Sequence, residues 1–307
     1  MILIRGLRKL RKFGNPVVAL GVFDGVHLGH INILKSAVAM ARSIKGQSMV
    51  ITFDPHPQKE PSLYSLEHRL RLFKQLGIDA AIVINFSKVF SAISAQSFLK
   101  DILCAKIGAR YIYVGKNFRF GKRAKGDLKL LRDLRKACGY KLKAFDVIRV
   151  SNKPVSSTFI RRLIKIGDLV HASKLLTRQV SILGTVIPGN SLGRLIGFPT
   201  ANINPHHEVI PPSGIYAVRV LVEGRAKSGI CYIGTRPTLE SSLGKSVNPK
   251  VHVEVHIFDF KNDIYNKYLE IRFIKKIRED RKFRTIKSLT AQIQIDAAAA
   301  KKILRLH

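Results

Sequence analysis

The stretch VVALGVFDGVHLGH, Val17 to His30, decides how the first half of the chain folds. It begins with a short apolar run, which is typical of a strand buried on both faces. It continues with three glycines and two histidines, His27 and His30, directly before an amphipathic segment. We therefore predict a strand that passes through a glycine-rich loop into the N-terminus of a helix, an arrangement that binds phosphate in open α/β sheets.

Short apolar runs and amphipathic segments continue to alternate until about Ile148. The expected strands are 17–23, 48–53, 80–86, 111–115 and 142–148, and the expected helices are 30–46, 66–77 and 95–108. Each of these helices ends at a glycine, which is a common helix stop. Alternating strands and helices predict a parallel, doubly wound, Rossmann-like α/β sheet.

The pattern changes after about Thr177, where apolar runs follow one another with only Gly, Pro and Asn turns between them. The expected strands are 180–187, 214–222, 226–234, 250–260 and 268–277, and an alanine-rich helix is expected over 285–306. Closely spaced strands predict an antiparallel sheet or small barrel. We therefore expect two domains, residues 1–176 and 177–307.

The composition agrees with two domains. A chain of 307 residues with 46% hydrophobic residues is long enough for two cores. No apolar run approaches the roughly 20 residues that span a bilayer, and the N-terminus lacks the pattern of a signal peptide. Three cysteines far apart, Cys104, Cys138 and Cys231, are typical of buried thiols in a reducing compartment. We expect a cytoplasmic protein without a membrane partner.

The charge is unusual, because 54 Lys and Arg stand against 20 Asp and Glu, a formal +34. An anionic partner, either nucleic acid or phosphate-bearing small molecules, is one interpretation. The other is that lysine fills exposed positions throughout, and the even spread of basic residues along the chain favours it. A nucleic-acid-binding protein stays as an alternative, although the chain has no tryptophan and no recognised nucleic-acid motif.

The loop after the first strand is the first candidate site. Its glycines, Gly21, Gly25 and Gly29, let the backbone turn tightly and approach a ligand. His27 and His30 are three residues apart across the first helical turn, so both side chains are able to donate to phosphate oxygens. A zinc site built on the same histidines is the weaker alternative, because no third ligand stands at a suitable spacing.

The second candidate site lies in the C-terminal half. Thr200 and Asn202 are two apart in an extended segment, so they face the same side and offer two neutral oxygen ligands for Mg²⁺. A Thr–Asn pair that caps a turn is the plainer alternative. Alternation in VHVEVHIF places Glu254 with His252 and His256 on the face opposite the valines.

Five segments taken together resemble one known family. GVFDGVHLGH resembles the HxGH signature of adenylyl-transferring nucleotidyltransferases. With TFDPHP (52–57), VGKNFRFGKRAKGD (114–127), SSTFIRRLIKIGD (156–168) and GFPTANI (197–203), in family order, the chain resembles the bacterial bifunctional riboflavin kinase/FAD synthetase family over nearly its whole length.

This resemblance implies that the N-terminal half transfers AMP from ATP to FMN, giving FAD and pyrophosphate. It implies that His27 and His30 act on the phosphates and that Arg161 clamps the triphosphate. The nucleotide- and flavin-binding residues it implies are Gly21, Phe23, Asp24, Gly25, Gly29, His56, Pro57, Asn117, Arg119, Asp127, Ser157 and Thr158. Ser156 is equally well explained as a plain N-cap. Two positions depart from the family pattern, Lys116 in place of an acidic residue and Phe159 in place of an arginine.

For the C-terminal half the resemblance implies phosphorylation of riboflavin to FMN, with ATP and Mg²⁺. Thr200 and Asn202 are then the metal ligands and Glu254 the base for the 5′-hydroxyl, while Gly193, Arg194 and Arg278 contribute to binding. The loop 240–250, which precedes the Glu254 strand, is rather long compared with the family pattern. The expected partners are riboflavin, FMN, FAD and ATP, with no specific nucleic acid, and self-association stays open. An adenylyltransferase with another acceptor and a ligand-binding barrel is the alternative within enzymes.

Overall fold

The computed structural model describes residues 1–8, 10, 12–55, 61–189, 193, 197–235 and 251–306. Contacts between Cα atoms divide the chain into two compact units, Met1–Ser157 and Thr158–His307. By this measure the helices between residues 158 and 176 group with the second unit. The expected domain boundary at 176/177 stays a prediction about where each half folds on its own.

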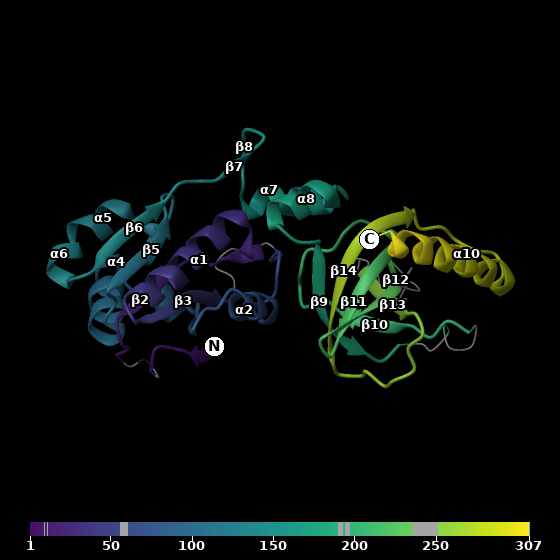
Figure 1. Cartoon of the computed structure of the whole chain (residues 1–307), viewed down its shortest axis with the longest axis horizontal. Coiled ribbons are helices and arrows are strands. Elements are labelled where there is room, and N and C mark those ends of the chain that lie inside the picture. The colour runs from purple at the N-terminus through teal and green to yellow at the C-terminus, as the bar shows by residue number, and fades with distance from the viewer. Residues whose placement is uncertain are drawn as a thin grey trace, which may run out of the picture. The chain divides into compact units, whose positions relative to one another are not determined.

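The first unit contains one six-stranded sheet in the order β1-β4-β3-β2-β5-β6, in which all neighbours are parallel (Figure 1). Its strands are β1 (Ile2–Arg5), β2 (Pro16–Leu20), β3 (Gln47–Asp54), β4 (Ala80–Asn85), β5 (Tyr111–Gly115) and β6 (Lys141–Phe145). The chain runs from β2 outward to β4 and then returns to place β5 on the other side of β2. The strand order therefore reverses between β2 and β5, and a ligand crevice is expected at their carboxyl ends.

Helices cover both faces of this sheet, because alternate residues of β2 belong to two different hydrophobic clusters. Val17 and Ala19 pack with the apolar stripes of α1 and α2, whereas Val18 and Leu20 pack with the segment from α4 through η2. The helical segments are α1 (Leu28–Ser43), α2 (Leu66–Gln75), α3 (Lys88–Ser91), α4 (Ala95–Ser97), the π-helical η2 (Phe98–Ile107), α5 (Leu128–Asp133) and α6 (Arg135–Cys138), with two 3₁₀ turns, η1 (Asp24–Val26) and η3 (Lys122–Ala124). A short antiparallel pair, β7 (Arg149–Val150) and β8 (Lys153–Pro154), follows. The predicted α/β class is confirmed.

The second unit is built on a closed antiparallel barrel in the order β10-β13-β12-β11-β14-β9. Its strands are β9 (Ser181–Ile187), β10 (Ala201–Asn204), β11 (Gly214–Val222), β12 (Arg225–Thr235), β13 (Val251–Ile257) and β14 (Tyr268–Arg278). Two helices, α7 (Ser157–Lys165) and α8 (Leu169–Leu176), precede the barrel, and α10 (Ile286–Arg305) follows it. The predicted barrel with a terminal helix is confirmed.

The terminal helix α10 packs on the outside of the barrel, against β11, β12 and β14 (Figure 1). Its Ala300 and Leu304 are buried in one cluster with Ile215 and Ile230 of the barrel. At the C-terminal end of α10, the Arg219 guanidinium of β11 donates to the Leu304 carbonyl at 2.6 Å. Apolar contact and this hydrogen bond both attach the helix to the barrel.

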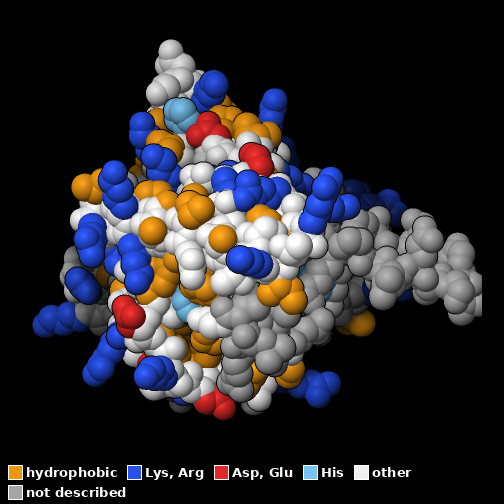
Figure 2. Space-filling view, turned by 90° about the vertical axis from the view of Figure 1, so that its right-hand side faces the viewer, with side chains coloured by type: hydrophobic (Ala, Val, Ile, Leu, Met, Phe, Trp, Pro, Cys, Tyr) orange, Lys and Arg blue, Asp and Glu red, His pale blue; other side chains and the backbone are white. Residues whose placement is uncertain are grey.

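The structure shows the surroundings of a cysteine thiol and the distribution of basic side chains on the surface. Burial, and then a hydrogen bond with Cys138, raise the pKa of the Cys104 thiol to about 12, so this thiol is protonated at neutral pH. Figure 2 shows Lys and Arg side chains at many points of the described part of this face, with few acidic ones between them. Across the described ranges, no helix combines the length and the apolar character needed to cross a membrane.

Candidate functional site

The loop after β2 is held in a conformation that only certain residues adopt. Phe23 has φ 54° and Gly25 φ 76°, both in the left-handed region. A Cβ atom on Gly25 would lie 2.6 Å from the Leu63 side chain, so this position requires glycine for space as well as for conformation. The Asp24 carboxylate is buried and accepts the Tyr64 backbone N–H at 3.2 Å. The loop is therefore fixed by its own backbone and by the segment before α2.

The two histidines stand together at the start of α1. Their rings are stacked with centroids 3.6 Å apart, and His30 also meets the Phe23 ring edge to face at 5.3 Å. His27 is the N-cap of α1, because its Nδ1 accepts the His30 backbone N–H at 3.4 Å. An accepting Nδ1 leaves the ring proton on Nε2, so the cap uses only one of the two ring nitrogens of His27. Capping and ligand binding are thus compatible at His27.

The remaining glycines of the motif flank this pair. Gly21 follows β2 directly and Gly29 lies in the first turn of α1. A Cβ atom on Gly29 would lie 3.3 Å from the His27 ring, so glycine leaves room for the stacked imidazoles. The histidine-bearing loop therefore occupies the carboxyl edge of β2, beside the point where the strand order reverses.

A buried arginine that the sequence analysis did not single out supports the same loop. Arg69 of α2 is 1% exposed and donates to the Val22 carbonyl and the Thr52 hydroxyl, each at 2.7 Å, and to the Phe53 carbonyl at 3.2 Å. The Thr52 hydroxyl in turn donates to the Val22 carbonyl at 2.8 Å. Arg69 thereby ties the loop after β2 to the end of β3.

The loop after β5 carries the other residues expected near this crevice. Asn117 and Arg119 are exposed, and the Arg119 guanidinium lies 3.2 Å from a carboxylate oxygen of Asp127. Asp127 caps α5, and the Leu130 N–H that it accepts, followed by the charge of Arg119, lowers the pKa of this exposed carboxyl. Lys116 pairs with Asp146, Nζ to Oδ1, at 2.5 Å. This loop leaves the carboxyl end of β5, and the histidine loop leaves the carboxyl end of β2. Both loops therefore start at the point where the strand order reverses.

The predicted triphosphate segment begins where the first unit ends. The Ser157 hydroxyl donates to the Asp24 carbonyl at 2.9 Å, which brings the start of α7 to the histidine loop. Thr158, Phe159 and Arg161 belong to the second unit, where Thr158 is exposed and Arg161 is 4% exposed. Ser156 stands immediately before α7. His56, Pro57 and Arg194, and the loop 240–250, lie outside the described residues.

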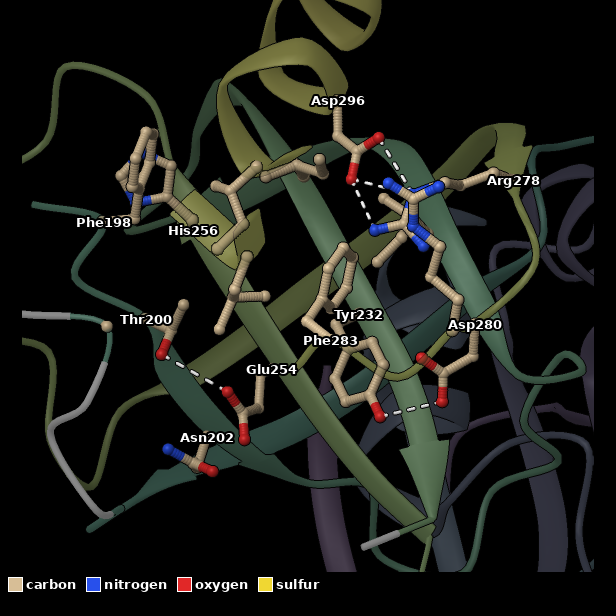
Figure 3. Close-up of a pocket in the computed structure, with 16 residues that line it drawn as sticks. Phe198, Thr200, Asn202, Tyr232, Glu254, His256, Arg278, Asp280, Phe283 and Asp296 are labelled. Carbon is tan, nitrogen blue, oxygen red and sulfur yellow. Dashed lines mark hydrogen bonds and ion pairs between the residues drawn. The ribbon is translucent and has the colours of Figure 1, made fainter. Parts of the chain in front are cut away.

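The second site is a cavity of about 270 Å³ in the barrel unit (Figure 3). It lies between the outer surface of the barrel and α10. The residues that line it are Gly193, Phe198, Thr200, Asn202, Ile215, Ile230, Tyr232, Glu254, His256, Arg278, Asp280, Arg281, Phe283, Leu289, Ile293 and Asp296. Strand register brings its polar groups together, because Asn202 of β10 and Tyr232 of β12 both face Glu254 of β13.

Thr200 completes this polar end of the cavity. Its hydroxyl lies 3.5 Å from the Glu254 Oε2 atom, and Asn202 points toward the same space (Figure 3). The hydroxyl and amide oxygens beside a carboxylate are the hard donors that Mg²⁺ prefers, so these residues fit that ion. Among the residues placed by the structure, no three His, Cys, Asp or Glu side chains form a metal cluster.

Two further contacts shape the same end. The Phe198 N–H donates to the Gly193 carbonyl at 2.7 Å, and His256 Nδ1 donates to the Pro199 carbonyl at 2.8 Å. A Cβ atom on Gly193 would lie 2.4 Å from the Phe198 carbonyl oxygen, so only glycine leaves room for this contact. These contacts hold the residues on both sides of Thr200 in place.

The opposite end of the cavity holds an ion pair, and the sequence predicted only one of its two members. Arg278, a predicted residue, contacts Asp296 of α10, with its Nη2 atom 2.7 Å from Oδ2. The Tyr232 hydroxyl donates to Asp280 at 3.1 Å, and Phe283 lies under the guanidinium of Arg281 at 4.8 Å. The sequence did not predict Asp296 as a site residue, because a single acidic residue in an alanine-rich helix is typical of a solvent-exposed surface.

Family models match both halves of the chain. The model described as FAD synthetase matches residues 10–159, and the model described as riboflavin kinase matches residues 176–304. Together they cover most of the chain and leave α7 and α8 largely between them.

Curated relatives match from end to end. Proteins named bifunctional riboflavin kinase/FMN adenylyltransferase are 36% identical in Bacillus subtilis (92% of this chain, 91% of that protein) and 33% identical in Escherichia coli K12 (100% and 99%). A solved structure from Streptococcus pneumoniae, described as a macrolide-efflux protein, has a TM-score of 0.81 and 27% identity, covering 96% of this chain and 97% of that one. Fold and order of the two halves are thus shared with these proteins.

Proposed function

The chain belongs to the bifunctional riboflavin kinase/FMN adenylyltransferase family, and we propose that its two activities reside at two separate sites, one in each half. The enzyme uses ATP to phosphorylate riboflavin to FMN and to adenylylate FMN to FAD. Our assignment gives FMN formation to the barrel cavity and FAD formation to the histidine loop. It also gives the halves the boundaries 1–176 and 177–307.

In the kinase step, the 5′-oxygen of riboflavin bonds to the γ-phosphorus of ATP, and ADP leaves. Glu254 accepts the proton of the 5′-hydroxyl and orients that oxygen. Thr200 and Asn202 would hold Mg²⁺, which when bound neutralises charge on the phosphates. The observation that carries this assignment is that Thr200, Asn202 and Glu254 meet at one end of a cavity that also has apolar walls and holds the Arg278–Asp296 pair at its other end.

In that cavity we place the flavin ring against the apolar walls, beside Arg278. Ile215 and Ile230 of the barrel and Leu289 and Ile293 of α10 offer flat hydrophobic contact, and Arg278 offers N–H donors to the ring carbonyls. Gly193 and Arg194 belong to the segment that we assign to the nucleotide. A polar group at Glu254 together with apolar walls fits a substrate with a hydroxylated chain on an aromatic ring.

In the adenylyl step, a phosphate oxygen of FMN attacks the α-phosphorus of ATP, and pyrophosphate leaves. Negative charge on the phosphorus oxygens is stabilised by fixed donors, for which we assign His27 Nε2 and His30. The glycine-rich loop and the start of α1 offer backbone N–H groups to the same phosphates.

The other residues that we assign to the adenylyl site are Phe23, Asp24, His56, Pro57, Asn117, Arg119, Asp127, Ser157, Thr158 and Arg161. Support comes from the position of the loops after β2 and β5 on either side of the strand-order reversal.

Small molecules account for the function without a nucleic-acid or membrane partner. Basic side chains stand at many separate points of the face in Figure 2, and the formal charge of the chain is +34, which supports general attraction of anionic substrates. The three free cysteines favour a reducing compartment, and we propose the cytoplasm.

The direct test is incubation of the purified protein with riboflavin, ATP and Mg²⁺, with FMN and FAD resolved by chromatography. Our proposal expects FMN to appear first and FAD to follow. FAD formation only from added FMN, with riboflavin never consumed, would favour the alternative of an adenylyltransferase with a ligand-binding barrel.

A further inference from the structure

An ion pair between Arg278 and Asp296 joins the end of β14 to α10, at the end of the cavity opposite Glu254. The Arg278 Nε atom lies 3.0 Å from both Asp296 oxygens, and its Nη2 atom lies 2.7 Å from Oδ2. Gln292 donates to the same carboxylate at 2.7 Å. Asp296 is 2% exposed, so its charge is neutralised almost entirely by these partners.

Attachment of the helix does not by itself explain this pair. Removing two charges from water is costly, and a buried ion pair is often no more stable than apolar residues of the same size. The same helix is already held by buried Ala300 and Leu304, and by Arg219 at the Leu304 carbonyl. The pair therefore has room for a second role, on the side that faces the cavity.

The hydrogen bonds of Arg278 fix the guanidinium in one plane and one orientation. Nε and Nη2 each donate to Asp296, and Nη1 donates to the Glu279 carbonyl at 2.9 Å. Three of the five N–H groups of a guanidinium are thereby used, and within the described residues no acceptor takes the other two. Arg278 lines the cavity, as Figure 3 shows, so its remaining donors are available to a ligand there.

We propose that Asp296, assisted by Gln292, is a positioning residue for riboflavin binding. Asp296 holds the Arg278 guanidinium so that its remaining N–H groups meet the carbonyl edge of the flavin ring, and α10 thereby becomes part of the flavin subsite. Asp296 acts through Arg278 and touches no reacting atom. The inference rests on the proposed kinase function of this cavity.

The test compares Asp296→Asn with the wild-type full chain in riboflavin phosphorylation at saturating ATP and Mg²⁺. Losing the charged hydrogen bonds frees the guanidinium, so the KM for riboflavin should rise roughly tenfold. The kcat and the KM for ATP should change by less than about twofold, since Glu254 and the phosphate end are untouched. Conversion of added FMN to FAD should be unchanged.

Arg219→Gln is the matched control, because it loosens the same helix at a point outside the cavity. An equal rise in the riboflavin KM for Arg219→Gln and Asp296→Asn would overturn the inference, since both would then act only by holding the helix. In the background Arg278→Gln, adding Asp296→Asn should cause no further rise, and a further rise would also overturn it.

If Asp296→Asn alone fails to fold, the double variant Arg278→Gln/Asp296→Asn is compared with Arg278→Gln. The double variant leaves no buried charge without a partner. Wild-type activity separates the two claims. A wild-type chain that never forms FMN from riboflavin would refute the proposed function itself, whereas normal wild-type kinetics with an unchanged KM in Asp296→Asn would refute only the positioning role.

Discussion

The two candidate sites are built in opposite ways. The histidine loop takes its main groups from one continuous stretch, Gly21 to His30, shaped by positive φ angles and a capped helix. The barrel cavity takes its groups from separate strands and from α10, and strand register alone brings Asn202 beside Glu254. A site made of contiguous residues tolerates little change in its backbone, whereas a site made by register depends on individual side chains.

The largest expected effect is at Glu254, where one side chain carries the proton transfer. Glu254→Gln keeps the size and removes the basicity, so kcat for FMN formation should fall by about 10²–10⁴-fold, the usual contribution of a general base. Steady-state rates of FMN formation measure this loss. Glu223→Gln, at an exposed pair with Lys267, is the control and should keep the wild-type rate. A fall of less than threefold in Glu254→Gln would remove the proposed base.

The second effect is at the histidines. His30→Ala should slow FAD formation from FMN by about 10²–10³-fold, the cost of one donor to developing charge. His27→Asn is the sharper variant, because asparagine is a good N-cap that lacks the Nε2 donor. If His27 only caps α1, His27→Asn will keep its FAD synthesis. Our account expects it to lose FAD synthesis while circular dichroism and FMN formation stay normal.

A smaller effect is expected at Arg161, which we assign to the triphosphate. Lysine keeps the charge but lacks the planar, two-pronged hydrogen bonding of a guanidinium. Arg161→Lys should therefore raise the KM for ATP in FAD synthesis by roughly tenfold, which is the scale of one strong charged hydrogen bond. The KM for ATP in FMN formation serves as the internal control. An unchanged ATP dependence of FAD synthesis would exclude Arg161 from the site.

The smallest effect on catalysis is expected at Arg69, which supports the loop without touching substrate. A change at Arg69 should act mainly on stability. Arg69→Met leaves three buried acceptors short of a donor, so the free energy of unfolding should fall by about 1–3 kcal/mol. Denaturant titration measures this, and Arg71→Met on the same helix, at a solvent-exposed pair with Glu67, should cost no more than about 1 kcal/mol. Equal losses in the two variants would show that Arg69 is not a support for the loop.

Much of the fold was predictable because each element carries a local signal. Periodicity located α1, α2, the helical segment 95–107, α10 and the central strands, but not the short helices α5, α6 and α8. Both faces of β2 are buried, as a continuous apolar run implies. The edge strand β1 was missed, since four residues with only Ile4 buried carry no pattern. Its pairing with β4 depends on residues 80–83, far along the chain.

The residues of the candidate sites were also predictable only where they carry a local sequence signal. The histidine loop was visible because its glycines and histidines are neighbours in the chain. Arg69 was not, because an arginine within LEHRLRLF gives no sign that it is buried. Asp296 was missed for a similar reason, since its partner Arg278 lies in another element and only the packing of α10 brings them together.

The central claim, that two independent sites act in sequence, is tested most directly by mixing two variants that are each blocked at one of the two steps. Glu254→Gln and His30→Ala proteins are incubated with riboflavin, ATP and Mg²⁺, separately and together, and FAD is measured by chromatography. We predict no FAD from Glu254→Gln alone, only FMN from His30→Ala alone, and FAD from the mixture, because released FMN reaches the intact histidine site. A Glu254→Gln protein that is folded but makes no FAD from added FMN, with no FAD in the mixture, would contradict the account and point to one shared site.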